Sequence, residues 1–248
     1  MKLNQDALRV LKPSWYIHQM KGWTKRSYQL LTLGIIVVIL TTITSDINAI
    51  SITTMFAGIL GYTTTLAITN AKPVNGMFGL ISAILYIIVA ISAKNYADVV
   101  LQAAYIILLD IPVLVLPKWS ENVQAHIRGL SDSKPLRDWG LTALFFIVVF
   151  GLLYLMDTQL FISPRPVLDA FAGAVGITGS ILATLRFRDQ YYFWIFQGVM
   201  SVILWGTTAF QGDANFTLLF TYTLYLLNDA LALFDKNIPW FHKSVDKR

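Results

Sequence analysis

The chain has 248 residues, of which 56% are hydrophobic and only 13% are charged, and its formal net charge is +5 at pH 7. Soluble globular proteins carry about 25% charged residues. This composition therefore excludes a water-exposed surface of ordinary polarity and, with a mean hydropathy of +0.60, indicates an integral membrane protein. The absence of cysteine excludes disulfides, thiol catalysis and cysteine metal sites.

The first 27 residues form a polar N-terminal segment that is rich in basic side chains. No compact apolar core with a small-residue cleavage site follows it, so we expect no cleaved signal peptide. The basic residues of segment 1–27 are Lys2, Arg9, Lys12, Lys21, Lys25 and Arg26.

Eight apolar runs follow along the chain, each of about 20 residues, the length that an α-helix needs to cross a bilayer. A polar stretch with two prolines, residues 117–138, separates the fourth run from the fifth and is predicted to be a central linker. The sequence therefore predicts an all-α, polytopic membrane protein with a tail at 236–248. Its transmembrane helices are expected near 28–45, 50–69, 75–93, 97–116, 139–157, 166–185, 190–210 and 214–234.

The basic residues are distributed unequally over the two sides of these eight helices. Seventeen of the 19 Lys and Arg residues fall on the side that holds both termini, and only Lys94 and Arg165 fall on the other. Cytoplasmic loops of membrane proteins carry such an excess, so we expect both termini and the linker in the cytoplasm. The charges thus anchor the chain in the lipid bilayer, and nucleic acid is not an expected partner. Beyond the N-terminal segment, the basic side holds Lys72, Lys118, Arg128, Lys134, Arg137, Arg186, Arg188, Lys236, Lys243, Lys247 and Arg248.

Three successive helices occur twice in the sequence. "FAGILGYTT" from Phe56 recurs as "FAGAVGITG" from Phe171, "FGLISAILY" (78–86) matches "QGVMSVILW" (197–205), and "YADVVLQAAY" (96–105) parallels "FTLLFTYTLY" (216–225). Equivalent helices are four apart, so we expect parallel repeats, about 50–116 and about 166–234, joined by a linker helix at 139–157. The repeated glycines are expected to let helix backbones approach closely; they are Gly58, Gly61, Gly173 and Gly176.

Aromatic and polar residues share one face in each of the last two helices. In the seventh helix they are Trp194, Gln197, Ser201 and Trp205, and in the eighth they are Tyr222, Tyr225 and Asp229, with Asn228 beside them. Polar side chains in the bilayer usually face the bundle interior. Two amides with four aromatic rings would suit a flat heteroaromatic ligand that carries an amide. The alternatives are an interfacial aromatic belt and interhelical hydrogen bonds.

Three carboxylates also fall within the predicted helices, and they leave a proton relay open as an alternative. Asp110 precedes Ile111 and Pro112, which is typical of a helix end or a kink. Asp169 lies near a helix start, where a carboxylate is favourable. Only Asp229 is embedded among apolar neighbours on the face described above.

Motifs of common enzyme classes are absent from the sequence. It has no HExxH, GxSxG or Walker sequence, and His18, His126 and His242 all lie in terminal or linker segments. We therefore expect no enzymatic activity, no metal site and no cofactor.

The segments "GLISAILYIIVAISAKNYADVVLQAAY", "FWIFQGVMSVILW" and "LLFTYTLYLLNDALAL" resemble the PnuC family of bacterial nicotinamide riboside transporters, over roughly residues 50–235. The resemblance implies a SWEET-like 3+1+3 bundle with an added N-terminal helix, in one transmembrane domain at 28–235. It also implies a homotrimer in the bacterial inner membrane. The implied activity is facilitated diffusion of nicotinamide riboside, which intracellular phosphorylation then retains.

The resemblance also implies a substrate site. Its positions correspond here to Trp194, Gln197, Trp205, Tyr222, Tyr225 and Asn228, with Tyr86 and Tyr105 as counterparts in the first repeat. The chain departs from the family pattern at Ser82 and Gly198, where the family often has Asn. Relatives carry thiamine or riboflavin, so these substrates and proton-coupled transport stay open as alternatives. A membrane enzyme acting on lipid and a structural or sensory membrane protein are the alternatives from other classes.

Overall fold

The computed structural model describes residues 9–116 and 127–235, and these residues fold almost entirely into helices. They include eight helices long and apolar enough to cross a membrane, which confirms the predicted all-α architecture. The helices are α1 Pro13–Gln19, α2 Lys25–Ile43, α3 Ala49–Thr69, α4 Val74–Ser92, α5 Tyr96–Tyr105 with its continuation α6 Ile111–Val115, α8 Pro135–Leu155, α9 Pro166–Thr184, α10 Gln190–Phe210 and α11 Thr217–Phe234.

The fifth membrane-spanning helix is longer than the sequence predicts. α8 begins at Pro135, and with the π-helical turn Met156–Leu160 that follows it, it covers 26 residues. Proline is favoured at the first helical position because its missing N–H would have no partner there. The predicted linker 117–138 is therefore shorter at its C-terminal end. Its residues 117–126, like the predicted tail 236–248, lie outside the described residues.

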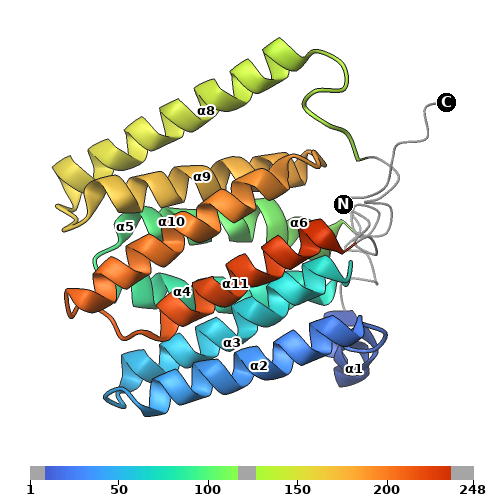
Figure 1. Ribbon diagram of the computed structural model, residues 1–248, viewed down its shortest axis with the longest axis vertical. Coiled ribbons are helices and arrows are strands. Elements are labelled where there is room, and N and C mark those ends of the chain that lie inside the picture. The colour runs from blue at the N-terminus through green and yellow to red at the C-terminus, as the bar shows by residue number, and fades with distance from the viewer. Residues whose placement is uncertain (1–8, 117–126, 236–248) are drawn as a thin grey trace.

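Six helices, three from each repeat, form a closed ring. α3 packs on α4, α4 on α5, α5 on α9, α9 on α10, α10 on α11, and α11 on α3. The first helix of each repeat thus contacts the last helix of the other, as a twofold axis along the helices requires. Outside the ring, α2 packs on α3 and α11, and α8 packs on α9 (Figure 1). The predicted 3+1+3 arrangement with an added N-terminal helix is confirmed.

The two repeats also end their first helices in the same way. After α3, Ala71 has φ 53°, and after α9, Arg186 has φ 62°. Positive φ is uncommon for a residue other than glycine, and these two positions are 115 residues apart, as Phe56 and Phe171 are. In each turn the next N–H donates to the carbonyl five residues back at 2.8 Å: Lys72 to Ala67, and Phe187 to Leu182.

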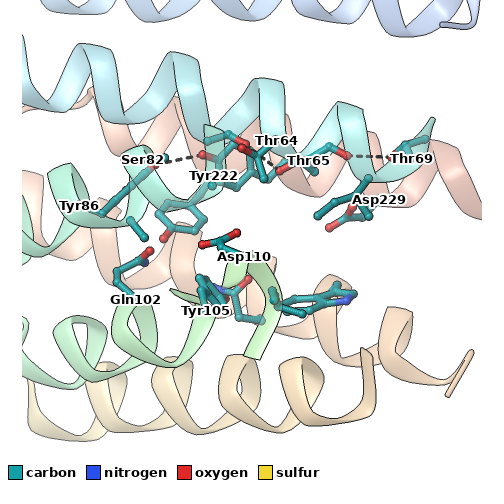
Figure 2. A pocket seen from close by; sticks show the side chains of 18 of the residues that line it. Thr64, Thr65, Thr69, Ser82, Tyr86, Gln102, Tyr105, Asp110, Tyr222 and Asp229 are labelled. Atoms are coloured by element: carbon teal, nitrogen blue, oxygen red, sulfur yellow. Dashed lines mark hydrogen bonds between the residues drawn. The ribbon is translucent and has the colours of Figure 1, made fainter. Parts of the chain in front are cut away.

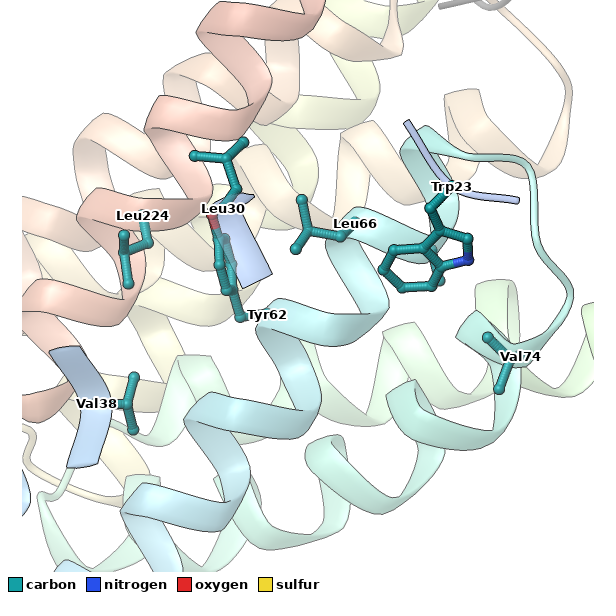
Figure 3. Close-up of a cluster of buried hydrophobic side chains, with 8 residues drawn as sticks. Trp23, Leu30, Val38, Tyr62, Leu66, Val74 and Leu224 are labelled. Atoms are coloured by element: carbon teal, nitrogen blue, oxygen red, sulfur yellow. The ribbon is translucent and has the colours of Figure 1, made fainter. Parts of the chain in front are cut away.

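A cluster of apolar side chains attaches the added helix α2 to the ring. Leu30 of α2 lies with Tyr62 and Leu66 of α3 and Leu224 of α11 (Figure 3). Gly34 is so close to the Tyr62 ring that a Cβ there would collide with it. Lipid is as apolar as these side chains, so close packing, rather than exclusion from water, holds α2 in place.

The described part of the linker lies against the turn between α9 and α10. The N–H of Arg128 donates to the carbonyl of Arg186 at 3.1 Å, and its carbonyl accepts from the N–H of Arg188 at 2.9 Å. Arg188 also pairs with Asp132 at 2.6 Å. The linker and this basic turn are therefore at the same end of the ring, an arrangement that the charge distribution predicts.

Candidate functional site

A cavity of about 140 Å³ lies inside the ring, and both repeats line it (Figure 2). Its wall is mainly apolar and aromatic with a few polar groups, which is typical of sites for small molecules. The wall residues are Gly61, Thr64, Thr65, Ile68 and Thr69 of α3; Gly79, Ser82, Ala83 and Tyr86 of α4; Gln102, Tyr105, Leu109 and Asp110 of α5 and its continuation; Tyr191, Trp194 and Gln197 of α10; and Tyr222, Tyr225 and Asp229 of α11.

Six of the eight site residues predicted from the sequence meet at this cavity: Tyr86, Tyr105, Trp194, Gln197, Tyr222 and Tyr225. The other two, Trp205 and Asn228, are not among its wall residues. Trp205 is completely buried in an apolar cluster with Tyr86 and Tyr222, so it lies behind the wall. The Asn228 amide donates to Thr69 Oγ1 at 3.1 Å and so joins α11 to α3.

The aromatic rings form two groups around the cavity. Tyr222 lies 5.2 Å from Tyr225 and 6.1 Å from Tyr86, measured between ring centroids, with interplanar angles of 64° and 66°. Tyr105 lies 5.8 Å from Trp194 at 58°. Edge-to-face and tilted pairs of this kind are favourable. A flat ring bound in the cavity would have aromatic neighbours from both repeats.

Two amide side chains in the wall are held by hydrogen bonds. Gln197 Nε2 donates to Ser201 Oγ at 2.7 Å, one helical turn further along α10. Gln102 Nε2 donates to Asp98 Oδ1 at 3.3 Å in the same manner on α5. Each bond fixes the direction of an amide that still has further donor and acceptor positions. The sequence prediction did not include Gln102 in the site, although its position three residues before Tyr105 places it on the same helical face.

The repeated glycines make room for tyrosines of the opposite repeat. A Cβ at Gly61 would collide with the Tyr225 hydroxyl, and a Cβ at Gly176 would come within 2.9 Å of the Tyr105 hydroxyl. Gly58, by contrast, faces Thr221 as a helix-packing position. The expected packing role therefore holds for Gly58, whereas Gly61 also shapes the cavity.

Asp110 lies within a continuing helix rather than at the helix end that Pro112 can indicate. The helix continues through a π-helical turn, Ile106–Asp110, into α6. Such a turn accommodates a proline within a helix because the i→i−4 hydrogen-bond pattern is already interrupted. The Asp110 carboxylate lies in the cavity (Figure 2) and is so close to Gly79 that a Cβ there would collide with it.

Asp169 is placed by the structure at the start of a neighbouring helix. Its carboxylate accepts hydrogen bonds from the backbone N–H groups of Ala97 at 2.9 Å and Asp98 at 3.0 Å. It therefore caps α5 in addition to lying in the first turn of α9, where the sequence placed it. This structural role leaves Asp229 and Asp110 as the carboxylates of the cavity wall.

The two ends of the ring differ in how they are closed. A second cavity shares Ile68, Leu109 and Trp194 with the first and reaches Lys72, which lies between α3 and α4 at the same end of the ring as the α9–α10 turn. At the other end, the buried Arg165 side chain donates to Asn95 Oδ1 at 3.0 Å and pairs with Asp213 at 2.7 Å. The loops of both repeats are thus tied together at the Arg165 end, and the second cavity extends from the first toward the basic end.

Comparisons with known proteins show the family and the fold of the chain. A family model described as nicotinamide mononucleotide transporter matches residues 51–240. The chain is 26% identical over 235 residues to the nicotinamide riboside transporter PnuC of Neisseria mucosa, covering 89% of this chain and 84% of that protein. It is 25% identical over 177 residues to PnuC of Haemophilus influenzae, covering 70% and 74%. A crystal structure of the vitamin B3 transporter PnuC has the same fold, with a TM-score of 0.68 and 23% identity over 92% of this chain and 96% of that one.

Proposed function

The chain belongs to the nicotinamide mononucleotide transporter family, and from this premise we propose that it mediates facilitated diffusion of nicotinamide riboside across the bacterial inner membrane. The observation that carries the proposal is the meeting of six predicted site residues around one cavity inside the helix ring. A transporter needs such a site between its repeats, near the axis about which they move.

The chemistry of the wall suits the nicotinamide group. The Tyr105 and Trp194 rings on one side and the Tyr222 and Tyr225 rings on the other supply stacking surfaces. The Gln197 amide, already oriented by Ser201, supplies a donor and an acceptor for a carboxamide. Trp205 and Asn228 support this wall from behind, through packing on Tyr86 and through the bond to Thr69.

The two departures from the family pattern have different positions relative to the cavity. Ser82 is in the wall, and its hydroxyl donates to the carbonyl of Ala57 at 2.9 Å. Gly198 faces Leu226 of α11. Only the first departure bears on substrate choice, so thiamine and riboflavin are the competing ligands to test.

Without energy coupling, net transport runs down the concentration gradient of the substrate. Substrate equilibrates across the membrane by rocking of one repeat against the other, and phosphorylation in the cytoplasm retains it. We place both termini and the basic end of the ring in the cytoplasm, because the linker and the α9–α10 turn lie at one end of the ring and this end carries most of the basic residues. A tag at residue 248 that is accessible only from outside intact cells would contradict this topology.

We also propose that the protein forms the homotrimer that the family resemblance implies. α8 packs mainly on α9 among the ring helices and leaves Leu144, Ile147 and Leu152 exposed. Other copies of the chain or lipid would cover this apolar face. Light scattering of the protein in detergent is expected to give the mass of three chains, and the mass of one chain would contradict the trimer.

A binding panel on the purified protein tests the proposed substrate. We expect the tightest binding for nicotinamide riboside, weaker binding for nicotinamide, which lacks the ribose, and the weakest for the phosphorylated mononucleotide. Tighter binding of thiamine or riboflavin would contradict the substrate but leave a vitamin transporter. Accumulation that follows an imposed proton gradient and disappears in Asp229→Asn would replace facilitated diffusion with proton coupling.

A further inference from the structure

The cavity wall contains two carboxylates that stacking and carboxamide recognition do not use. Asp110 and Asp229 both belong to the wall, one from each repeat. Tyr105 and Tyr225 are 120 residues apart, and the aspartates are 119 apart. The difference is the extra residue that the π-helical turn after Tyr105 accommodates. The two carboxylates therefore take corresponding positions in the two repeats.

Asp110 is buried without a partner. Its residue is 3% exposed, and among the described residues its Oδ2 atom has no hydrogen bond. Figure 2 shows its carboxylate between Tyr222 and Tyr105, in the interior of the cavity. A buried charge that lacks a partner is costly, and within a membrane such a group marks a functional site by default. A ligand is the missing partner that this geometry accommodates.

The wall offers no positive charge of its own. None of its described residues is Lys, Arg or His. The ion pairs among the described residues involve other carboxylates, those of Asp132, Asp138, Asp213 and Asp235. The aromatic rings add to the same preference, because the faces of Trp and Tyr attract cations. The cavity is thus suited to a ligand that is flat, aromatic and positively charged.

We infer that Asp110 and Asp229 select a flat aromatic cation, in which the ring charge lies beside the carboxylates while Gln197 binds the carboxamide. The inference rests on the proposed function, because the oxidised nicotinamide ring of the riboside is a pyridinium cation. The same carboxylates repel the phosphate of the mononucleotide, so one pair of residues both attracts the substrate and excludes its trapped product.

A pair of ligands that differ in charge tests the inference. Nicotinamide riboside is a cation, and its dihydro form keeps the ribose and the carboxamide but has no ring charge. By calorimetry on the full chain in detergent, we expect the wild-type protein to bind the cation on the order of tenfold more tightly than the dihydro form. Asp110→Asn and Asp229→Asn should each reduce this preference, while the affinity for the dihydro form stays within about twofold. Unchanged binding of the neutral ligand also shows that the variants are folded.

Asp157→Asn is the matched control, since Asp157 is a completely buried carboxylate on the turn after α8 and outside the cavity wall. This variant should keep the wild-type preference. Equal affinities of the wild-type protein for the two ligands, or equal losses of both in the Asp110 and Asp229 variants, would contradict the inference and leave the proposed function standing. Failure of both ligands to bind the wild-type protein would contradict the proposed function, and the inference with it.

Discussion

Shortening Gln197 and Asn228 to alanine separates a residue that binds the substrate from one that supports the site. The Gln197 amide is in the cavity wall, so Gln197→Ala leaves the substrate carboxamide without a partner in a site poor in water. The loss of a hydrogen bond together with an unsatisfied polar group costs about 1–3 kcal/mol, or about 5- to 150-fold in affinity. Asn228 bonds to Thr69 instead, so Asn228→Ala removes an interhelical bond worth about 0.6–2 kcal/mol of stability.

Calorimetry with two ligands distinguishes these effects. The ligands are nicotinamide riboside and the pyridinium riboside that lacks the carboxamide. Gln197→Ala should weaken binding of the first far more than that of the second, whereas Asn228→Ala should lower the melting temperature and change both affinities equally. Equal losses for both ligands in Gln197→Ala would refute recognition of the carboxamide by this residue. A carboxamide-specific loss in Asn228→Ala would mean that this side chain reaches the substrate directly.

Four other substitutions test separate parts of the structure. Trp194→Ala removes the ring that lies 5.8 Å from Tyr105. It should weaken the binding of nicotinamide riboside by at least about 0.5–1.5 kcal/mol, the contribution of one aromatic pair. Unchanged affinity would exclude stacking on this ring. Gly61→Ala introduces a Cβ against the Tyr225 hydroxyl at a cost of about 1–3 kcal/mol and should reduce affinity, whereas Gly58→Ala should lower only the melting temperature. Arg165→Gln leaves buried groups without their partner and should reduce stability by about 1–3 kcal/mol; an unchanged melting temperature would show that the Arg165 end is closed by other contacts.

The membrane-spanning helices and the repeat could be predicted because both leave direct traces in the sequence. Hydropathy gives the eight spans, and the three pairs of matching phrases give the ring of six helices. The matching turns could not be predicted, because Ala71 and Arg186 are not residue types that favour positive φ. The surrounding helices impose that conformation on them.

Helical periodicity predicts the direction of a side chain but not its height along the helix. Trp205 shares a face with Trp194, yet it is 11 residues further along α10, which corresponds to about 16 Å at the rise of an α-helix. It therefore packs on the far side of the wall residues Tyr86 and Tyr222 and does not line the cavity. On α11, Asp229 is seven residues after Tyr222 and returns to within about 20° of its direction, whereas Asn228 is turned about 120° away. The periodicity thus favours Asp229 for the wall, and the structure agrees.

Asp110 shows where single-sequence reasoning fails at the site. Proline two residues later is normally the sign of a helix end, since it lacks an N–H and restricts the preceding residue. Only the three-dimensional packing shows that a π-helical turn carries the chain through this point and turns the carboxylate into the cavity. No pattern in the sequence separates such a turn from an ordinary helix end.

Uptake of labelled nicotinamide riboside by liposomes that contain only this protein tests the central claim most directly. With no ion gradient and no kinase, the internal concentration should rise to the external concentration and stop there, and excess unlabelled riboside should abolish the labelled flux. Uptake no faster than in liposomes without protein, or accumulation above the external concentration, would contradict facilitated diffusion by this chain.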